Sequence, residues 1–568
     1  MGGQPVELQG LGVGRGSALA PLVQMYPAPV IPDDEPVLPP EEAFSVVESA
    51  LQAVAADLRT HATAAEPTLS AILTATAAIA TDPALLKDVQ WRLETGRGPA
   101  SALDGAVAHF AQLLTDAGGI TAERVTDLRS VRDRAVARLL GQPDPGVPRL
   151  TTPCVVAAVD LSPDQVAALD LSLVRALLMA EGGPTGHSAL VASQLGLPCV
   201  VQVRGISQVA PGTMVGVDAT TGAVVLNPNA NQRAHLEHRR EIESRLTADQ
   251  VPGSTSDGHP VHLMATIGSV EDARRGAAVA NEGVGLLRTE LLFLGRQLAP
   301  SVAEQATHYR KVLDQFPGQV VTVRTWDAGV DKPLPFAEGS GAENPSLGLR
   351  GFRGVRRWPH LLETQLEALA LAYEQHREDT REPAQLQVMA PMITTVGETR
   401  QFVSLARSYG LQRIGVTIEV PAAALRAGQI VSEVDFVAIG TNDLAQYTMA
   451  ADRRLGDLAD LLSPWQPAVL ELVASSTREA RRNHTPVTVC GESASDPLMA
   501  LVLTGFGVRA LSMPPGAMPA VRYLLRRVSL AQCQTAAQAT LTATDAASAR
   551  AAVLELITPE DRTVLELQ

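Results

Sequence analysis

The spacing of apolar residues changes along the chain, and the first long pattern is helical. Between residues 41 and 140, apolar side chains return every three or four positions, as in Val47, Leu51 and Val54. This is the spacing of one buried helix face. Prolines and glycines interrupt the stretch, so it predicts a bundle of about four helices. No catalytic group of residues stands out there, which favours a packing or docking module.

Short apolar runs on both sides of this bundle predict the strands of an α/β domain. These runs are Leu19–Val23, Cys154–Ala158, Val174–Met179, Cys199–Val203, Met214–Asp218 and Ala223–Leu226. The first follows a glycine-rich stretch at residues 10–16, which we expect to form a turn. A nucleotide-binding loop is a weaker interpretation of these glycines, because no Lys-Ser/Thr pair follows them.

Proline-rich segments at residues 26–40 and 141–148 have the composition of linkers. We therefore expect an α/β domain formed by residues 1–30 and 146–228. A helical domain at residues 31–145 would be inserted into it. Residues 229–258 are expected to form a charged linker helix followed by a hinge at Val251–His259, where glycine, serine and proline are frequent.

From residue 260 onward, eight apolar runs alternate mostly with helical stretches. The runs are Val261–Ala265, Val284–Leu287, Val320–Val323, Leu386–Ala390, Ile414–Ile418, Phe436–Ile439, Val487–Val489 and Val508–Leu511. Eight strand–helix units over about 300 residues are typical of a (β/α)8 TIM barrel. We expect this barrel to occupy residues 259–568, which makes the chain an α/β multidomain protein.

Polar residues stand where these apolar runs end. They include Thr266, Arg288, Arg324 with Asp327, Glu419, Asn442 with Asp443, Cys490 and Ser512, and Pro391-Met392 stands at the corresponding end of the fourth run. In a TIM barrel all of these positions fall on the C-terminal face, where active sites are built. One such residue would mean little, but a ring of them is hard to explain by packing.

The charged members of this ring predict a site for a multiply charged anion. The expected cations are Arg288, Arg324, Arg453, Lys332 and Arg350. Arginine forks bind phosphate and carboxylate groups in a bidentate way. Glu419 and Asp443 supply the hard oxygen ligands that Mg²⁺ prefers. For any single acid–arginine pair, a structural ion pair is the favoured interpretation, but the whole set at successive strand ends favours a binding site.

Two further residues have open interpretations. Asn442 can donate its amide to a phosphate oxygen. Cys490 can be a buried apolar residue, a nucleophile or a proton donor, and its position after Val489 favours the structural role.

Composition narrows the class of protein. The 568 residues carry a net charge of −15, which argues against a nucleic-acid-binding protein. Four scattered cysteines fit neither a disulfide framework nor a zinc site, so we expect a reducing, cytoplasmic setting. The N-terminus has no signal-peptide pattern, and no apolar run is long enough for a membrane span.

The stretch Gly182–Leu190 places His187 between a glycine-rich turn and an expected helix. Free N–H groups at a helix N-terminus favour an anion, so a phosphoryl group on the histidine ring would be well placed there. Taken alone, His187 is more simply interpreted as a residue that helps to cap the helix.

Six motifs resemble the phosphoenolpyruvate-utilising enzyme family, and the overall plan is similar to its enzyme I branch. They are Gly-Gly-Pro-Thr-Gly-His-Ser-Ala-Leu (182–190), Gly-Leu-Leu-Arg-Thr-Glu (285–290), Arg-Thr-Trp-Asp-Ala-Gly-Val-Asp-Lys-Pro (324–333), Glu-Asn-Pro-Ser-Leu-Gly-Leu-Arg (343–350), Gly-Thr-Asn-Asp-Leu-Ala-Gln-Tyr (440–447) and Val-Cys-Gly-Glu (489–492). The resemblance extends over nearly the whole chain.

The resemblance implies a role for each matching position. His187, on a swivelling phosphohistidine domain, would accept the phosphoryl group of phosphoenolpyruvate, releasing pyruvate, and pass it to the phosphocarrier HPr, the first step of a sugar phosphotransferase system. Cys490 would be the proton donor. The substrate would be bound by Arg288, Arg324, Asn442, Asp443 and Arg453, and Mg²⁺ by Glu419 and Asp443. The helical domain would dock HPr, and the barrel domain would form a homodimer.

Some positions depart from the family pattern. Gly186 stands where serine usually precedes the histidine, Gly14-Arg15-Gly16 replaces Ser-Pro-Gly, Thr266 replaces an asparagine, and Thr76 replaces a histidine of the helical domain. A phosphoenolpyruvate synthase or pyruvate phosphate dikinase would need a large nucleotide-binding domain, for which this chain has no room. A paralogue that serves another carrier and a non-catalytic docking protein are further alternatives.

Overall fold

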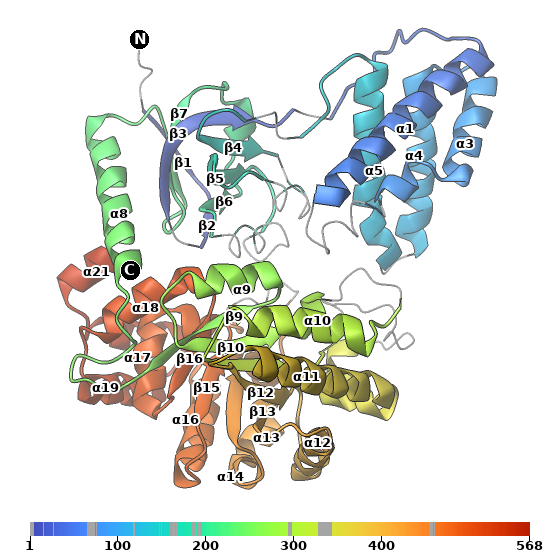
Figure 1. The fold of residues 1–568 in the computed structure, drawn as a ribbon. Coiled ribbons are helices and arrows are strands. Elements are labelled where there is room, and N and C mark those ends of the chain that lie inside the picture. The colour runs from blue at the N-terminus through green and yellow to red at the C-terminus, as the bar shows by residue number, and fades with distance from the viewer. Residues whose placement is uncertain are drawn as a thin grey trace. The chain divides into compact units, whose positions relative to one another are not determined.

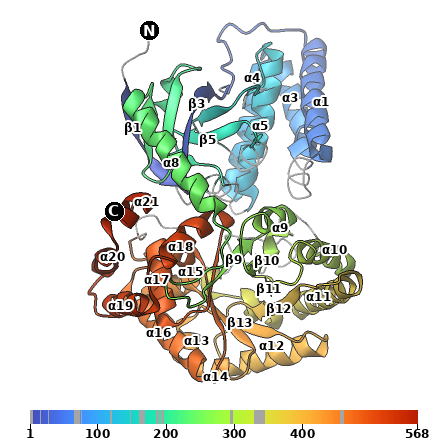
Figure 2. The ribbon, with the colours of Figure 1, turned by 60° about the vertical axis from the view of Figure 1, so that its left-hand side comes forward.

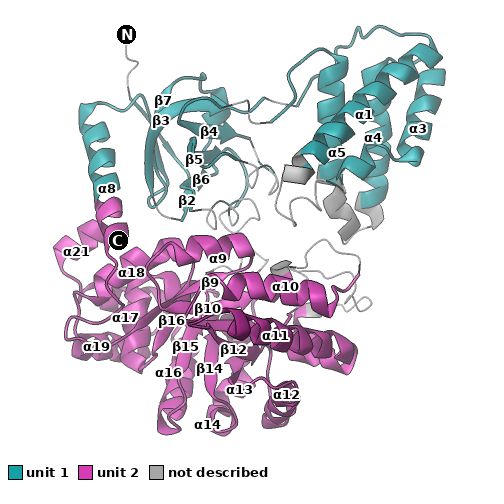
Figure 3. Cartoon of the chain, viewed as in Figure 1, with its two compact units in different colours: residues 1–241 teal, residues 242–568 magenta. Residues whose placement is uncertain are grey.

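The computed structural model describes two compact units, residues 1–241 and residues 242–568 (Figure 3). The residues described are 5–14, 16–26, 28–64, 74, 76–117, 120–146, 148, 150–159, 161, 165, 169–183, 189, 192, 196–292, 298–327, 344–453, 458 and 460–567. His187, Gly186, Lys332 and Arg15 lie outside these residues. Among the described helices, none combines the length and the apolar character that a bilayer crossing requires.

The first unit contains a mixed eight-stranded sheet in the order β1-β8-β7-β3-β4-β5-β6-β2 (Figure 1). Its strands are β1 (Val6–Gln9), β2 (Leu11–Val13), β3 (Ser17–Gln24), β4 (Cys154–Ala158), β5 (Val174–Met179), β6 (Cys199–Val201), β7 (Met214–Asp218) and β8 (Ala223–Leu226).

The glycine-rich stretch at residues 10–16 contains β2 where we expected a turn, and β1 directly precedes it. The glycines are needed for close approach between chain segments. A Cβ on Gly12 would lie 1.9 Å from the carbonyl oxygen of Ala219, and one on Gly10 would lie 2.5 Å from that of Val201. Because β3 follows β2 directly, these glycines do not precede a helix as a nucleotide loop would.

Among the described residues, four long helices lie in the sequence between β3 and β4, which are parallel neighbours in the sheet. They are α1 (Pro40–Ala64), α3 (Pro83–Glu94), α4 (Pro99–Ala117) and α5 (Ile120–Leu139). Their apolar faces share one core that includes Val47, Leu51 and Val54. The Glu35 carboxylate caps α4, accepting hydrogen bonds from the backbone N–H of Ala100 at 2.6 Å and of Ser101 at 3.0 Å.

Helix α8 (Ala230–Ala248) leads into the second unit. The following segment, expected as a hinge, is bonded to the barrel unit. The N–H of Ser256 donates to the carbonyl of Val528 at 3.0 Å, and the Asp257 carboxylate accepts from the N–H of Leu530 at 3.0 Å.

The second unit is built on a closed barrel of eight parallel strands, which confirms the expected fold (Figure 2). The strands are β9 (His262–Ile267), β10 (Gly283–Arg288), β11 (Val320–Arg324), β12 (Gln385–Ala390), β13 (Ile414–Ile418), β14 (Phe436–Gly440), β15 (Val487–Cys490) and β16 (Ala510–Met513). Each overlaps one of the eight apolar runs.

Helices surround these strands on the outside (Figure 2). They include α9 (Val270–Ala277), α10 (Val302–Leu313), α11 (Pro359–Asp379), α12 (Val396–Ser408), α13 (Pro421–Leu425), α14 (Ala427–Val431), α15 (Thr441–Met449), α16 (Pro467–Arg482), α17 (Pro497–Phe506), α18 (Met518–Leu525), α19 (Leu530–Leu541), α20 (Ala546–Leu554) and α21 (Pro559–Leu565). Aliphatic side chains from the strands and the surrounding helices form one large hydrophobic core.

Candidate active site

The carboxyl ends of neighbouring barrel strands carry the residues singled out by the sequence. Arg288 and Arg324 are the last residues of β10 and β11, and Cys490 is the last residue of β15. Glu419 follows β13, and Asp443 lies in the first turn of α15 directly after β14. Since parallel strands present these ends on one face of the barrel, the side chains share one mouth.

A row of ion pairs crosses this mouth, in which carboxylates and arginines alternate. Glu290 binds Arg324 at 2.5 Å, and Arg324 lies 3.5 Å from Asp327. Asp327 in turn binds Arg350 at 2.7 Å.

The chain of charges continues to α15. Arg350 binds Asp443 at 2.6 Å, and Arg453 lies 3.9 Å from the same carboxylate. With Arg288 and Glu419 included, four arginines face four carboxylates. The arginines that form these ion pairs are therefore among those that the sequence predicted to form an anion-binding site.

The arginines of the mouth differ in how far they are engaged. Within the described part of the chain, Arg288 makes no ion pair and no side-chain hydrogen bond. Burial and the nearby Arg324 lower its pKa below the usual value for arginine. Nε of Arg324 is also buried without a hydrogen-bond partner among the described residues. No described residue occupies these donors, so they fit an anion.

Glu419 is held by neutral donors. Its Oε1 accepts hydrogen bonds from the backbone N–H of Met392 at 2.7 Å and from the hydroxyl of Thr417 at 2.5 Å. Met392 has φ of 61°, a left-handed conformation that a non-glycine residue adopts only under constraint. The other oxygen, Oε2, lies beside Gly440, where a Cβ would approach it to 2.5 Å.

Burial raises the pKa of Glu419, and the charges of Asp443 and Asp327 raise it further. The two carboxylates of Glu419 and Asp443 are therefore close enough to repel each other, and a cation between them would relieve this repulsion. Among the described residues, no group of three His, Cys, Asp or Glu side chains forms a metal cage. Two carboxylate ligands, with other positions left to water and substrate, fit the way Mg²⁺ is commonly bound.

Cys490 is buried inside the barrel, within an apolar cluster that includes Leu286, Met389 and Phe436. Burial, followed by the charge of Glu419, raises the pKa of its thiol to about 12. The Sγ–H donates weakly to the carbonyl of Ile439 at 3.5 Å. This thiol stays protonated at neutral pH, so it can serve as an acid but is a poor nucleophile.

Asn442 is oriented by the segment after β15. Its Oδ1 accepts a hydrogen bond from the N–H of Glu492 at 3.2 Å. Gly491 has φ of 111°, and a Cβ there would lie 2.7 Å from this oxygen. The carbonyl end of the amide is thereby engaged, which leaves the NH2 end for another acceptor.

The structure adds three residues that the sequence did not single out: Glu290, Thr417 and Tyr447. One had a usable signal, because Thr417 lies on β13 and stands two residues before Glu419. Residues two apart on a strand share a face. Glu290 lies in the short 3-10 helix Thr289–Leu292 and Tyr447 acts through a loop contact, which sequence spacing does not encode. Met392 was expected at a strand end, but its backbone contact with Glu419 was not.

Two of the departures from the family pattern are accommodated locally. The hydroxyl of Thr266, inside β9, is 2.8 Å from that of Ser512. Thr76 is buried.

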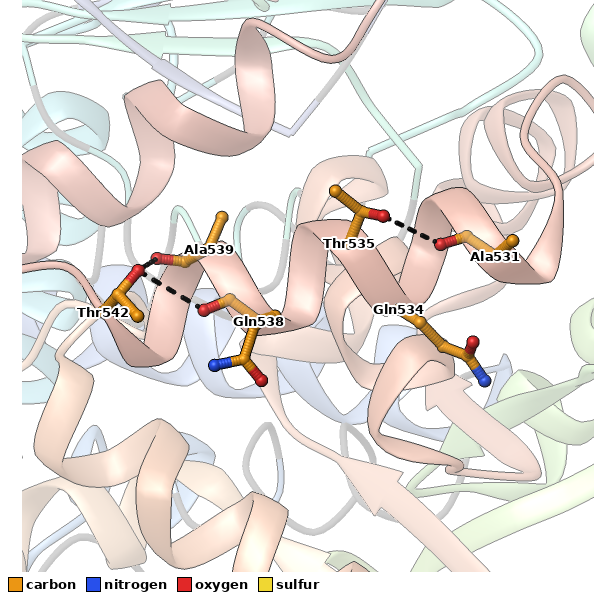
Figure 4. A pocket seen from close by; sticks show the side chains of 6 residues that line it. All are labelled: Ala531, Gln534, Thr535, Gln538, Ala539 and Thr542. Atoms are coloured by element: carbon orange, nitrogen blue, oxygen red, sulfur yellow. Dashed lines mark hydrogen bonds between the residues drawn. The ribbon is translucent and has the colours of Figure 1, made fainter.

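A surface groove of about 500 Å³ runs along α19 (Figure 4). It is lined by Ala531, Gln534, Thr535, Gln538, Ala539 and Thr542. The hydroxyls of Thr535 and Thr542 donate to carbonyls of their own helix. No residue of the barrel mouth lines this groove.

Three family models match the chain: the PEP-utilising enzyme N-terminal domain at residues 9–124, the mobile domain at 150–222 and the PEP-binding domain at 243–530. A phosphoenolpyruvate-protein phosphotransferase of Streptomyces coelicolor is 44% identical, covering 97% of this chain and 99% of the relative. One of Geobacillus stearothermophilus is 35% identical, covering 81% and 82%.

Among solved structures, an NMR solution structure of Enzyme I (nEIt) covers 41% of this chain and 98% of its own, with 24% identity and a TM-score of 0.36. The sequence relatives, the matched family models and the TIM barrel all indicate the same family. The chain belongs to the phosphoenolpyruvate-protein phosphotransferase family of PEP-utilising enzymes.

Proposed function

We propose that this chain transfers the phosphoryl group of phosphoenolpyruvate to its own His187, releases pyruvate, and then passes the group to a histidine of the phosphocarrier HPr. The observation that carries the proposal is the barrel mouth, where arginine donors without partners among the described residues, two adjacent carboxylates and a protonated buried thiol meet. An anion acceptor, a cation site and a proton source are the three functions that this reaction needs.

Substrate binding is assigned first to Arg288 and to Nε of Arg324, which have no hydrogen-bond partner within the described part of the chain. These two arginines, with Arg453, would neutralise the phosphate and carboxylate, and the Asn442 amide would donate to a phosphate oxygen. Lys332, outside the described residues, would add a further cation. In a partly buried mouth such charges act more strongly than in water.

Glu419 and Asp443 would hold Mg²⁺. When bound, the ion would offset the charge of the substrate oxygens during transfer. Oε2 of Glu419 is the oxygen that Met392 and Thr417 leave open, so we assign metal ligation to it.

The transfer step balances with residues of this chain. A nitrogen of neutral His187 forms a bond to phosphorus as the bond from phosphorus to the enol oxygen breaks. The enolate of pyruvate is then protonated at its methylene carbon by the Cys490 thiol. The thiolate regains a proton from solvent. Burial of Cys490 suits this role because it keeps the proton in place until the enolate forms.

The remaining assignments rest on the family resemblance. The helical domain would dock HPr, the barrel domain would form a homodimer, and the protein would act in the cytoplasm. Because His187 must meet both the barrel and the carrier, its domain has to swing, with hinges near residues 141–148 and 226–258. Since Ser256 and Asp257 are bonded to the barrel unit, we place the second hinge before them.

The test is incubation with phosphoenolpyruvate labelled in its phosphoryl group, together with Mg²⁺. The wild-type chain should gain an acid-labile, base-stable label that moves to added HPr. His187→Ala should gain none while keeping its fold by circular dichroism. Equal labelling of the variant would refute the proposal, and labelling without transfer to HPr would point to another carrier.

A further inference from the structure

Arg350 has every donor engaged by the protein. Nε and Nη2 bind the two oxygens of Asp327 at 3.1 and 2.7 Å. Nη1 and Nη2 bind the two oxygens of Asp443 at 2.6 and 3.3 Å. Nη1 also donates to the hydroxyl of Tyr447 at 3.3 Å. A guanidinium group carries five N–H donors, so none remains for a further acceptor.

Several features make this arrangement rigid. Arg350 and Asp327 are 4% and 2% exposed. Burial alone would lower the pKa of Arg350, but the charges of Asp327 and Asp443 raise it above its usual value. Tyr447 donates its own proton to the carbonyl of Ser346 at 2.5 Å, so its oxygen is free to accept from Arg350. This contact ties the segment before Arg350 to α15.

The geometry points to Arg350 as a positioning residue that orients the Asp443 carboxylate, rather than as a ligand of the substrate. Arg288 is the opposite case, since its donors have no partner among the described residues. The sequence placed both arginines among the substrate-binding residues. The inference rests on the proposed function, in which Asp443 holds the metal.

The planar guanidinium of Arg350 has two edges that each bind a carboxylate, and this explains how it orients Asp443. The edge formed by Nε and Nη2 is fixed by Asp327, so the remaining edge points in one direction. Asp443 meets that second edge with both oxygens, which fixes the plane of its carboxylate. Groups that hold a metal ligand in this way commonly affect metal affinity by about 10- to 100-fold.

The test is metal binding without substrate, measured by electron paramagnetic resonance of Mn²⁺ added to the full chain. Arg350→Lys keeps the charge but loses the fork. We expect it to weaken Mn²⁺ binding about tenfold. Arg288→Lys, the matched control, should stay within about twofold of wild type while raising the KM for phosphoenolpyruvate.

Unchanged Mn²⁺ affinity in Arg350→Lys would overturn the inference. If that variant does not fold, Tyr447→Phe takes its place, because it removes one acceptor without changing charge. We expect it to weaken Mn²⁺ binding by about threefold, and unchanged binding would again overturn the inference. The readout needs no phosphoryl transfer, so a failure of His187 labelling would refute the proposed function separately.

Discussion

Glu419 and Asp443 stand at adjacent strand ends with the same proposed role, but the protein holds them by different means. Oε1 of Glu419 is held by two neutral donors, the Met392 N–H and the Thr417 hydroxyl. Asp443 is held by the charged fork of Arg350, with Arg453 nearby. Neutral donors orient a buried carboxylate without neutralising it, whereas a paired arginine does both.

This difference separates two properties of a metal site. The negative charge of Glu419 is unfavourable in the metal-free site, since burial and neighbouring acids raise the pKa of this carboxyl. The negative charge of Asp443 is already compensated by Arg350 in the metal-free site. A site built only from compensated carboxylates would attract a cation weakly, and one built only from uncompensated carboxylates would destabilise the empty protein.

The largest expected effect is on the stability of the metal-free protein. Asp443→Asn removes the charge that compensates Arg350, and breaking a buried pair commonly costs about 3 kcal/mol. Glu419→Gln removes a charge that burial disfavours, so it should raise the melting temperature at pH 8 by a few degrees. Thermal unfolding in the presence of a chelator measures both variants.

The pH dependence of Glu419→Gln follows from the same pKa. A carboxyl with a raised pKa in the folded state binds protons more tightly there than in the unfolded chain. Ionising it therefore destabilises the fold as pH rises from its ordinary value of 4.5 upward. The advantage of glutamine should disappear as pH falls toward that value. A shift of the same sign in Asp443→Asn and Glu419→Gln at pH 8 would contradict the contrast.

A smaller effect is expected from Thr417→Val, which keeps shape but removes one of the two donors to Oε1 of Glu419. The carboxylate would gain rotational freedom, and Mn²⁺ affinity should fall about three- to tenfold. Thr417→Ser keeps the hydroxyl and serves as the control. Titration of both variants with Mn²⁺ decides the point, and equal affinities would show that Met392 alone positions Glu419.

The sequence predicts the barrel well because its strands are buried on both faces and therefore appear as unbroken apolar runs. Residues that follow such runs must lie on one face, and this rule alone is enough to place Arg288, Glu419 and Cys490 at the barrel mouth. The ends of the runs are less well defined. The last strand, expected at Val508–Leu511, is Ala510–Met513.

What the sequence could not predict depends on contacts between distant residues. Asp327 and Arg350 are 23 positions apart, and Arg350 and Asp443 are 93 apart. Nothing in their spacing distinguishes Arg350 from Arg288, although one is fully engaged and the other has no partner among the described residues. The strands at the glycine-rich start were missed for a similar reason, since Gly12 is required by the approach of Ala219.

The smallest expected effect concerns Cys490, because the two carboxylates raise the pKa of its thiol by unequal amounts. After burial, Glu419 is the main cause that raises its pKa, and Asp443 contributes less. In metal-free protein, Glu419→Gln should therefore lower the pKa of Cys490 and speed its alkylation by iodoacetamide, which reacts with the thiolate. Asp443→Asn should speed it less. Mass spectrometry of the Cys490 peptide gives the rate.

Cys199 provides an internal control for this experiment. Burial raises its pKa to about 12, and no charged neighbour among the described residues contributes. Its alkylation rate should therefore be the same in wild type and both variants. If Cys199 and Cys490 accelerate together, the variants have loosened the protein as a whole. If Asp443→Asn accelerates Cys490 more than Glu419→Gln does, Asp443 is the less compensated carboxylate, and the contrast between the two is reversed.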